Sequence, residues 1–98
     1  MSMGKQLHVK EIVIPKSRVY CRGNVHLIKL PIDISQYVDI NKELKFYVKI
    51  NNMFIPIGNR KVWYDKALRG YVISLPVQLN ELWSQLKGKE VDVVVRVD

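Results

Sequence analysis

The side chains that could do chemistry in this sequence form a small nucleophilic and acid–base set and a much larger basic set. The first set consists of one cysteine, Cys21, and two histidines, His8 and His26. None of the three has an acidic or nucleophilic partner nearby in the sequence, and no cysteine or histidine pair has metal-ligand spacing. We therefore expect no enzymatic activity, no metal, no cofactor and no disulfide, so that packing alone stabilises the fold.

The basic residues are more informative because they gather in two stretches. The chain carries 16 Lys and Arg against 9 Asp and Glu, for a net charge of +7. Residues 1–29 have a net charge of +5 and residues 58–70 a net charge of +3, while the remainder is close to neutral. Such clusters are typical of surfaces that bind nucleic acid, although lysines on exposed strands also protect sheet edges from aggregation.

The composition predicts one small, mostly β domain over residues 1–98. This length suits a single domain, and 48% hydrophobic with 26% charged residues is typical of a globular chain. There are 14 valines and 10 isoleucines against a single alanine, which favours strands over helices. No apolar run is long enough to span a membrane, and the start lacks the apolar stretch of a signal peptide. We therefore expect a soluble, cytoplasmic protein with no membrane partner.

Two similar segments follow one another, Arg22 to Ile50 and Arg69 to Val97. Each has Arg-Gly, a short apolar strand ending in Leu-Pro, a brief helical stretch, Lys-Glu and a closing strand. The Arg-Gly and Lys-Glu pairs recur at an offset of 47 residues and the Leu-Pro pairs at 45. At the offset of 47, the alternate apolar positions of the closing strands coincide: Leu44, Phe46, Val48 and Ile50 with Val91, Val93, Val95 and Val97. Because this match preserves one buried strand face, the sequence predicts two copies of one unit.

Helical spacing between Leu-Pro and Lys-Glu predicts two short helices, the second ended by Gly88. The residues with this spacing are Ile34, Tyr37 and Val38 in the first copy, and Leu79, Leu82, Trp83 and Leu86 in the second. Pro and Gly positions divide the rest of the chain into further strands. These strands are expected at Leu7–Pro15, Ser17–Cys21, Met53–Ile57 and Lys61–Asp65.

This arrangement resembles the AbrB/MazE/SpoVT family of swapped-hairpin β-barrel DNA-binding domains. The family pattern is a basic residue with Gly, a strand ending in an apolar-Pro pair, a short helix and a closing strand. After Pro31, the residues Ile34, Val38 and Ile40 match the family's apolar positions. The following stretch, LKFYVKINNMFIPI, matches the family's last two strands.

Family members usually build the barrel from two identical chains, whereas both units lie in one chain here. The resemblance therefore implies a mostly β fold with two short helices: a swapped-hairpin β-barrel that forms a single-chain pseudo-dimer of two AbrB-like units. Repeat 1 is placed at about residues 16–57 and repeat 2 at about 61–98. The N-terminal strand, residues 7–15, is expected to complete the second unit near Glu90 to Val97. The expected assembly is a monomeric pseudo-dimer or a weak homodimer.

In this family the two hairpin arms lie on one face and carry the DNA-contacting residues, and both basic clusters fall on those arms here. The resemblance implies a transcriptional regulator that docks its basic hairpin arms on double-stranded DNA. Arginine is well suited to reading guanine edges, whereas many lysines contact phosphate. The candidate base contacts are Arg18, Arg22, Arg60 and Arg69, and the candidate phosphate contacts are Lys16, Lys61 and Lys66.

Two other functions are compatible with the same residues. One is a protein partner: a protein-interaction or antitoxin-like module without direct DNA binding, which would use the hairpin Asn51–Arg60. The other is RNA or single-stranded nucleic acid, because aromatic rings near the arms stack on unpaired bases of any sequence. The aromatic residues concerned are Tyr20, Trp63, Tyr64 and Tyr71.

Overall fold

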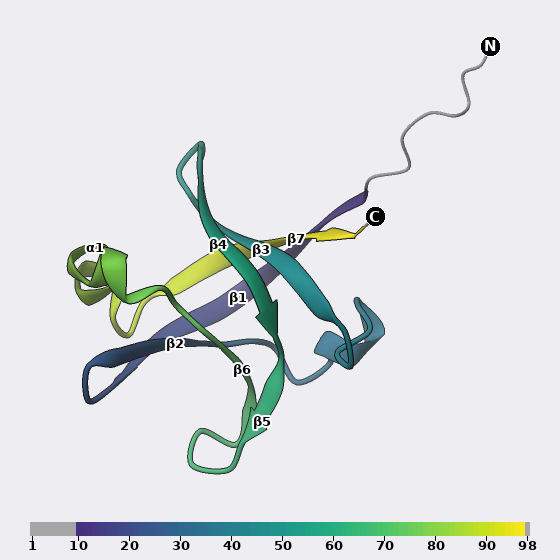
Figure 1. The fold of residues 1–98 in the computed structure, drawn as a ribbon, viewed down its shortest axis with the longest axis horizontal. Coiled ribbons are helices and arrows are strands. Elements are labelled where there is room, and N and C mark those ends of the chain that lie inside the picture. The colour runs from purple at the N-terminus through teal and green to yellow at the C-terminus, as the bar shows by residue number, and fades with distance from the viewer. Residues whose placement is uncertain (1–9, 98) are drawn as a thin grey trace.

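The computed structural model describes residues 10–97. These residues form mainly one antiparallel sheet, which curls on itself (Figure 1). Its strands are β1 (Lys10–Arg22), β2 (Val25–Lys29), β3 (Glu43–Ile50), β4 (Met53–Lys61), β5 (Trp63–Asp65), β6 (Gly70–Ser74) and β7 (Glu90–Val97). Their order is β4-β3-β7-β1-β2-β6-β5, and Val62 alone separates β4 from β5 along the chain. The two ends of this order are therefore consecutive in sequence. The predicted mostly β class is confirmed, and the antiparallel sheet curls into a half-barrel.

Helical structure lies between each Leu-Pro and Lys-Glu pair, but only one of the two expected helices is a true α-helix. In the second copy η3 (Val77–Leu79) leads into α1 (Asn80–Leu86), and Gly88 follows with a φ of 78°, as predicted. The first copy forms only the 3-10 turn η2 (Ile34–Gln36). This segment is rich in isoleucine and valine, which are stiff and poor in helices, whereas α1 contains Glu, Leu and Gln. Among residues 10–97 there is no helix long and apolar enough to cross a membrane.

Two strands that were expected to stop at Pro or Gly continue through a β-bulge instead. The register of β1 with β7 shifts between Ile14 and Ser17, so that β1 runs on past Pro15. The register of β4 with β3 also shifts, between Pro56 and Gly58. A bulge holds an extra residue outside the ladder and therefore tolerates a missing N–H donor or a positive φ. The expected strand ends at Pro15 and before Gly58 were wrong for this reason.

The strand pairings follow a twofold pattern. In the β3–β7 pair Tyr47 lies opposite Val94, and the two residues are equivalent at the offset of 47. In the β2–β6 pair Ile28 lies opposite Ile73, and these are equivalent at the offset of 45. When equivalent residues of two copies face each other in antiparallel strands, a local twofold relation between the copies passes through that pair.

Backbone hydrogen bonds beside β2 and β6 obey the same relation. Leu30 N donates to Tyr71 O at 2.8 Å. Its counterpart at the offset of 45 is the bond from Leu75 N to His26 O, at 2.9 Å. The Leu-Pro signals recognised in the sequence therefore occupy corresponding places in the sheet.

The equivalence also extends upstream of the repeat found in the sequence. Val13 of β1 faces Val94, and Pro56 of β4 faces Tyr47, so residues 10–22 correspond to residues 53–65 at an offset of 43. Both strands carry a bulge in this region, after Ile14 in β1 and between Pro56 and Gly58 in β4. We refer to residues 10–50 as the first copy and to residues 53–97 as the second copy. The pairing of β1 with β7 confirms the predicted position of the N-terminal strand from Lys10 onward, while residues 7–9 of that prediction lie outside the described residues.

The core takes side chains from both copies. The predicted inward faces of the closing strands are confirmed where the structure describes the side chains, with Ile50 only partly buried; Val97 of that prediction lies outside the described side chains. The buried members of those faces are Leu44, Phe46, Val48, Val91, Val93 and Val95. Trp83 is fully buried from α1, and its Nε1 donates to Pro76 O at 2.8 Å, so that no indole donor is left unpaired in the core.

Candidate nucleic-acid interface

A basic pocket of about 270 Å³ lies where β1, the end of β2 and the start of β6 meet. Its lining residues are Lys16, Arg18, Tyr20, Lys29, Leu30, Pro31, Ile32, Arg69 and Gly70. Four of them are cations, and none is acidic. We call this site the basic pocket. Its charge makes it suited to an anion.

Two strands bring Arg18 and Lys29 directly opposite each other. The β1–β2 register pairs these two residues, and like charges in such a pair repel. The Arg18 guanidinium donates from Nη1 to Gly88 O at 2.6 Å and from Nη2 to Glu90 Oε2 at 3.1 Å. These bonds fix the guanidinium and offset part of its charge. Lys29 has no ion pair among residues 10–97.

The other two cations of the basic pocket lie on unusual backbone. Lys16 is the bulge residue of β1 with a φ of 61°, and Arg69 precedes β6 with a φ of 57°. Within the described residues, Asn51 is the one other non-glycine residue with positive φ. Left-handed conformations are costly for long side chains and are often found at functional sites. Neither Lys16 nor Arg69 forms an ion pair with another described residue.

A glycine shapes the pocket at the start of β6. A Cβ added at Gly70 would lie 2.6 Å from Cε of Lys29. The Lys29 side chain therefore passes directly over the glycine backbone, and the missing side chain makes room for it. Lys29 was not among the candidate residues. Its position beside the Leu-Pro pair did not predict that it lines the same pocket as Arg69 and Lys16.

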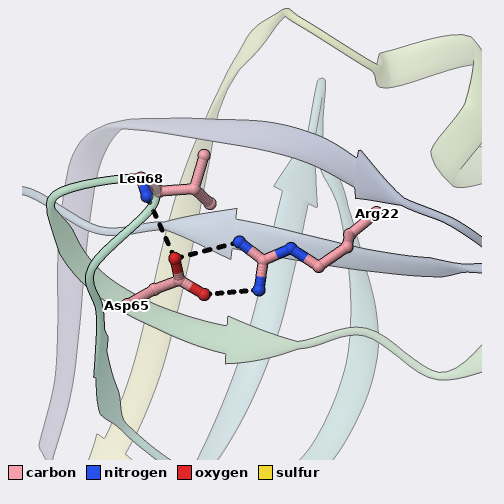
Figure 2. Close-up of polar contacts among 3 residues, drawn as sticks. All are labelled: Arg22, Asp65 and Leu68. Carbon is pink, nitrogen blue, oxygen red and sulfur yellow. Dashed lines mark hydrogen bonds and ion pairs between the residues drawn. The ribbon is translucent and has the colours of Figure 1, made fainter.

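An ion pair joins the hairpin formed by β1 and β2 to the hairpin formed by β5 and β6, next to their turns (Figure 2). Arg22 ends β1 and Asp65 ends β5, and the guanidinium binds both carboxylate oxygens, at 2.6 Å and 2.9 Å. The backbone N–H of Leu68 donates to the same carboxylate at 3.0 Å. Asp65 is buried, while the Arg22 side chain stays 51% exposed. The hydrogen bonds from Arg22 and the Leu68 backbone lower the pKa of Asp65 from 3.8 to about 2.

The remaining candidate residues do not line the basic pocket. Lys66 is exposed in the turn between β5 and β6. Arg60 and Lys61 are consecutive on β4, so their side chains point to opposite faces of the sheet. Lys61 is exposed, and Arg60 is half-buried. Of the seven predicted residues, the structure thus brings Lys16, Arg18 and Arg69 into one pocket and connects Arg22 to the neighbouring turn.

The nucleophilic and acid–base residues form no cluster in the described part of the chain. His26 is buried, and its Nδ1 lies 3.0 Å from Oδ1 of Asn80. Cys21 is half-buried, and its Sγ donates to Gly23 O at 3.3 Å. Residues 10–97 contain no group of three His, Cys, Asp or Glu side chains placed to hold a metal. His8 lies outside the described residues.

The residues behind the two alternative functions are partly exposed. Tyr20 lines the basic pocket, and Tyr64 packs edge-on against Tyr71 with ring centroids 5.3 Å apart. On the hairpin formed by β3 and β4, Met53 is 63% exposed and Phe54 is 54% exposed. Base stacking by these aromatic residues and protein binding by this hairpin therefore stay predictions.

Comparisons with known proteins do not identify the chain. No protein-family model matches it, and searches of curated proteins and of solved structures found no match. The resemblance to swapped-hairpin domains therefore stays a prediction that depends on the residues quoted for it.

Proposed function

We propose that this chain is a DNA-binding protein, acting as a transcriptional regulator, that docks duplex DNA on the surface around its two hairpins. The observation that carries the proposal is the convergence of Lys16, Lys29 and Arg69 on one pocket without an ion-pair partner among residues 10–97. Clustered cations free of internal anions bind phosphate backbones by releasing the counterions of the DNA.

The hairpin geometry supports a continuous surface rather than two separate arms. The Arg22–Asp65 ion pair connects the strand ends that precede the two turns. Lys66 lies in the turn between β5 and β6, and the same turn leads to Arg69 of the basic pocket. We propose a single-chain, swapped-hairpin pseudo-dimer as the scaffold of this surface, and the twofold pattern of the pairings supports it.

The direct test is fluorescence anisotropy with a labelled duplex of random sequence. If five cations contact phosphates, affinity falls about 500-fold between 50 and 200 mM salt. Arg69→Ala should weaken binding and make the salt dependence less steep by about one unit of log–log slope. Lys45→Ala removes an equal charge from β3, which does not line the basic pocket, and should leave binding nearly unchanged.

Two results would count against the proposal. One is a duplex affinity that does not depend on salt. The other is an equal loss of affinity in the Arg69→Ala and Lys45→Ala variants, since equal losses would mean that only the net charge of the protein matters.

A further inference from the structure

We infer that the basic pocket is a phosphate site that holds one phosphate group between Lys16, Lys29 and Arg69. The inference rests on the proposed function for the source of the phosphate, which is nucleic acid, but the chemistry of the site can be tested without DNA. It differs from a general basic surface in predicting a saturable site at one place on the molecule.

The charge around the pocket calls for an anion. Arg18 and Lys29 are cross-strand neighbours, and only Arg18 is offset by a carboxylate. A phosphate group placed among these cations would attract each of them and offset their mutual repulsion. Phosphate suits the arrangement better than a carboxylate because its oxygens accept hydrogen bonds from several directions at once.

The size of the pocket also fits a small anionic group. Its volume of about 270 Å³ lies just below the range of roughly 300–1,000 Å³ that is usual for small-molecule sites. A phosphate with part of its attached sugar is therefore a better occupant than a large planar ligand. Tyr20 and Ile32 border the cations and provide apolar surface for that sugar.

A different local backbone feature positions each of the three cations. A bulge with a φ of 61° presents Lys16, and a left-handed residue with a φ of 57° presents Arg69. Gly70 leaves the space that the Lys29 side chain occupies. Three independent local features that converge on one pocket argue against a chance meeting of surface lysines.

The second copy of the repeat serves as an internal control. At the offset of 43 Asn59 corresponds to Lys16, although Asn59 is paired with Lys45 and Lys16 lies in the bulge. At the offset of 45 Ser74 corresponds to Lys29. The second copy therefore forms a β-bulge in the same part of the strand, with its positive φ on Gly58, and the same β6 strand position, without either charge. The two lysines are not required by the scaffold, so their presence in one copy points to a ligand.

The test transplants the residues of the second copy into the first. Sodium pyrophosphate is titrated into the full-length, isotope-labelled protein at constant ionic strength, and backbone amide shifts are followed by NMR. We expect saturable shifts confined to residues 16–20, 29–32 and 69–70. The double variant Lys16→Asn/Lys29→Ser should lose at least tenfold in affinity. The control Lys42→Asn/Lys45→Ser removes two exposed charges elsewhere and should keep the wild-type affinity.

Three results would overturn the phosphate site: shifts spread over all lysines, no saturation, or equal affinity in the two double variants. Asn tolerates the left-handed backbone at position 16 better than most residues, and Ser already occupies the β6 position that corresponds to Lys29. The pocket variant is therefore expected to fold, and its amide spectrum verifies this.

Duplex binding by the same proteins separates this inference from the proposed function. If pyrophosphate binds in the pocket but the wild type binds no DNA, the proposed function fails and the phosphate site stands. If DNA binds while pyrophosphate does not, the phosphate site fails. If the pocket variant loses pyrophosphate but keeps full DNA affinity, the nucleic-acid source is wrong.

The phosphate can be an internal diester or a terminal monoester, and a matched pair of duplexes decides between them. Equal affinity for duplexes with 5′-phosphate and 5′-hydroxyl ends supports an internal diester. Tighter binding of the phosphorylated duplex, lost in Lys16→Asn/Lys29→Ser, supports a terminal phosphate.

Discussion

At the scale of single residues, Asp65 is the one buried acidic side chain among residues 10–97. Its carboxylate is buried, accepts two bonds from Arg22 and accepts one from the Leu68 backbone. Both interactions favour the ionised form, which explains the low pKa of about 2. The contact stabilises the junction of the hairpins, and it occupies a guanidinium that was a candidate for reading bases.

The stability of the fold should therefore depend on pH through Asp65. Because the folded pKa lies below its ordinary value of 3.8, the contribution is present above about pH 4 and is lost as the pH falls toward 2. We expect the free energy of unfolding in urea to drop over this window in the wild type. The drop should be smaller in Asp65→Asn, whereas Glu81→Gln, which alters an exposed carboxyl of α1, should follow the wild type. Identical profiles for Asp65→Asn and the wild type would contradict this account.

A substitution at Lys16 should affect the stability of the fold and the affinity for DNA differently. Glycine at this position removes the strain of a left-handed backbone, which stabilises the folded state by about 1–2 kcal/mol. It also raises the conformational entropy of the unfolded chain, which costs about 0.5–1 kcal/mol of stability. Thermal unfolding of Lys16→Gly should therefore show a stability within about 1 kcal/mol of the wild type. Its duplex affinity should nevertheless fall severalfold, because a phosphate contact is lost. A strongly destabilised variant would mean that the lysine side chain supports the fold.

At the scale of elements, alternation and helical spacing predicted the closing strands and α1 because burial on one face leaves a strong periodic signal. The continuity of β1 through Pro15 could not be read in the same way, since Pro marks a strand end as often as a bulge. The correspondence of residues 10–22 with 53–65 was also missed. Only a few inward positions are alike there, such as Ile14 with Ile57 and Val19 with Val62, and the outward residues differ.

The approach of β2 to β6 gives a prediction at the same scale. Gly70→Ala would bring a Cβ within 2.6 Å of the flexible end of Lys29, which must then move aside. Unfolding stability should change little, while duplex affinity should fall about as far as in Lys29→Ser. The double variant should lose no more than either single one, because both changes remove the same ammonium group from the pocket. Additive losses measured by anisotropy would show that Gly70 acts through another residue.

At the scale of the whole molecule, the strand pairings are symmetric and the charge is not. Residues 10–50 and 53–97 follow one pattern of strands, yet only the first copy presents Lys16 and Lys29. The sequence predicted the duplication from its recurring apolar signals. It did not predict which cations converge, because that depends on side-chain directions at a bulge and on the passage of Lys29 over Gly70.

The same pairing pattern predicts how the molecule responds to being cut. Only the β1–β2 and β5–β6 pairs join strands of one copy, whereas β1–β7, β3–β4, β3–β7 and β2–β6 all join one copy to the other. Each copy alone would leave most of its strand edges and its core face exposed to water. Separate chains ending and restarting at the exposed Asn51–Asn52 turn should therefore show little β-structure by circular dichroism. When mixed, they should form a folded one-to-one complex by light scattering. A fragment that folds alone as a monomer would contradict this prediction. It would show that each copy is an independent folding unit that does not need the other copy.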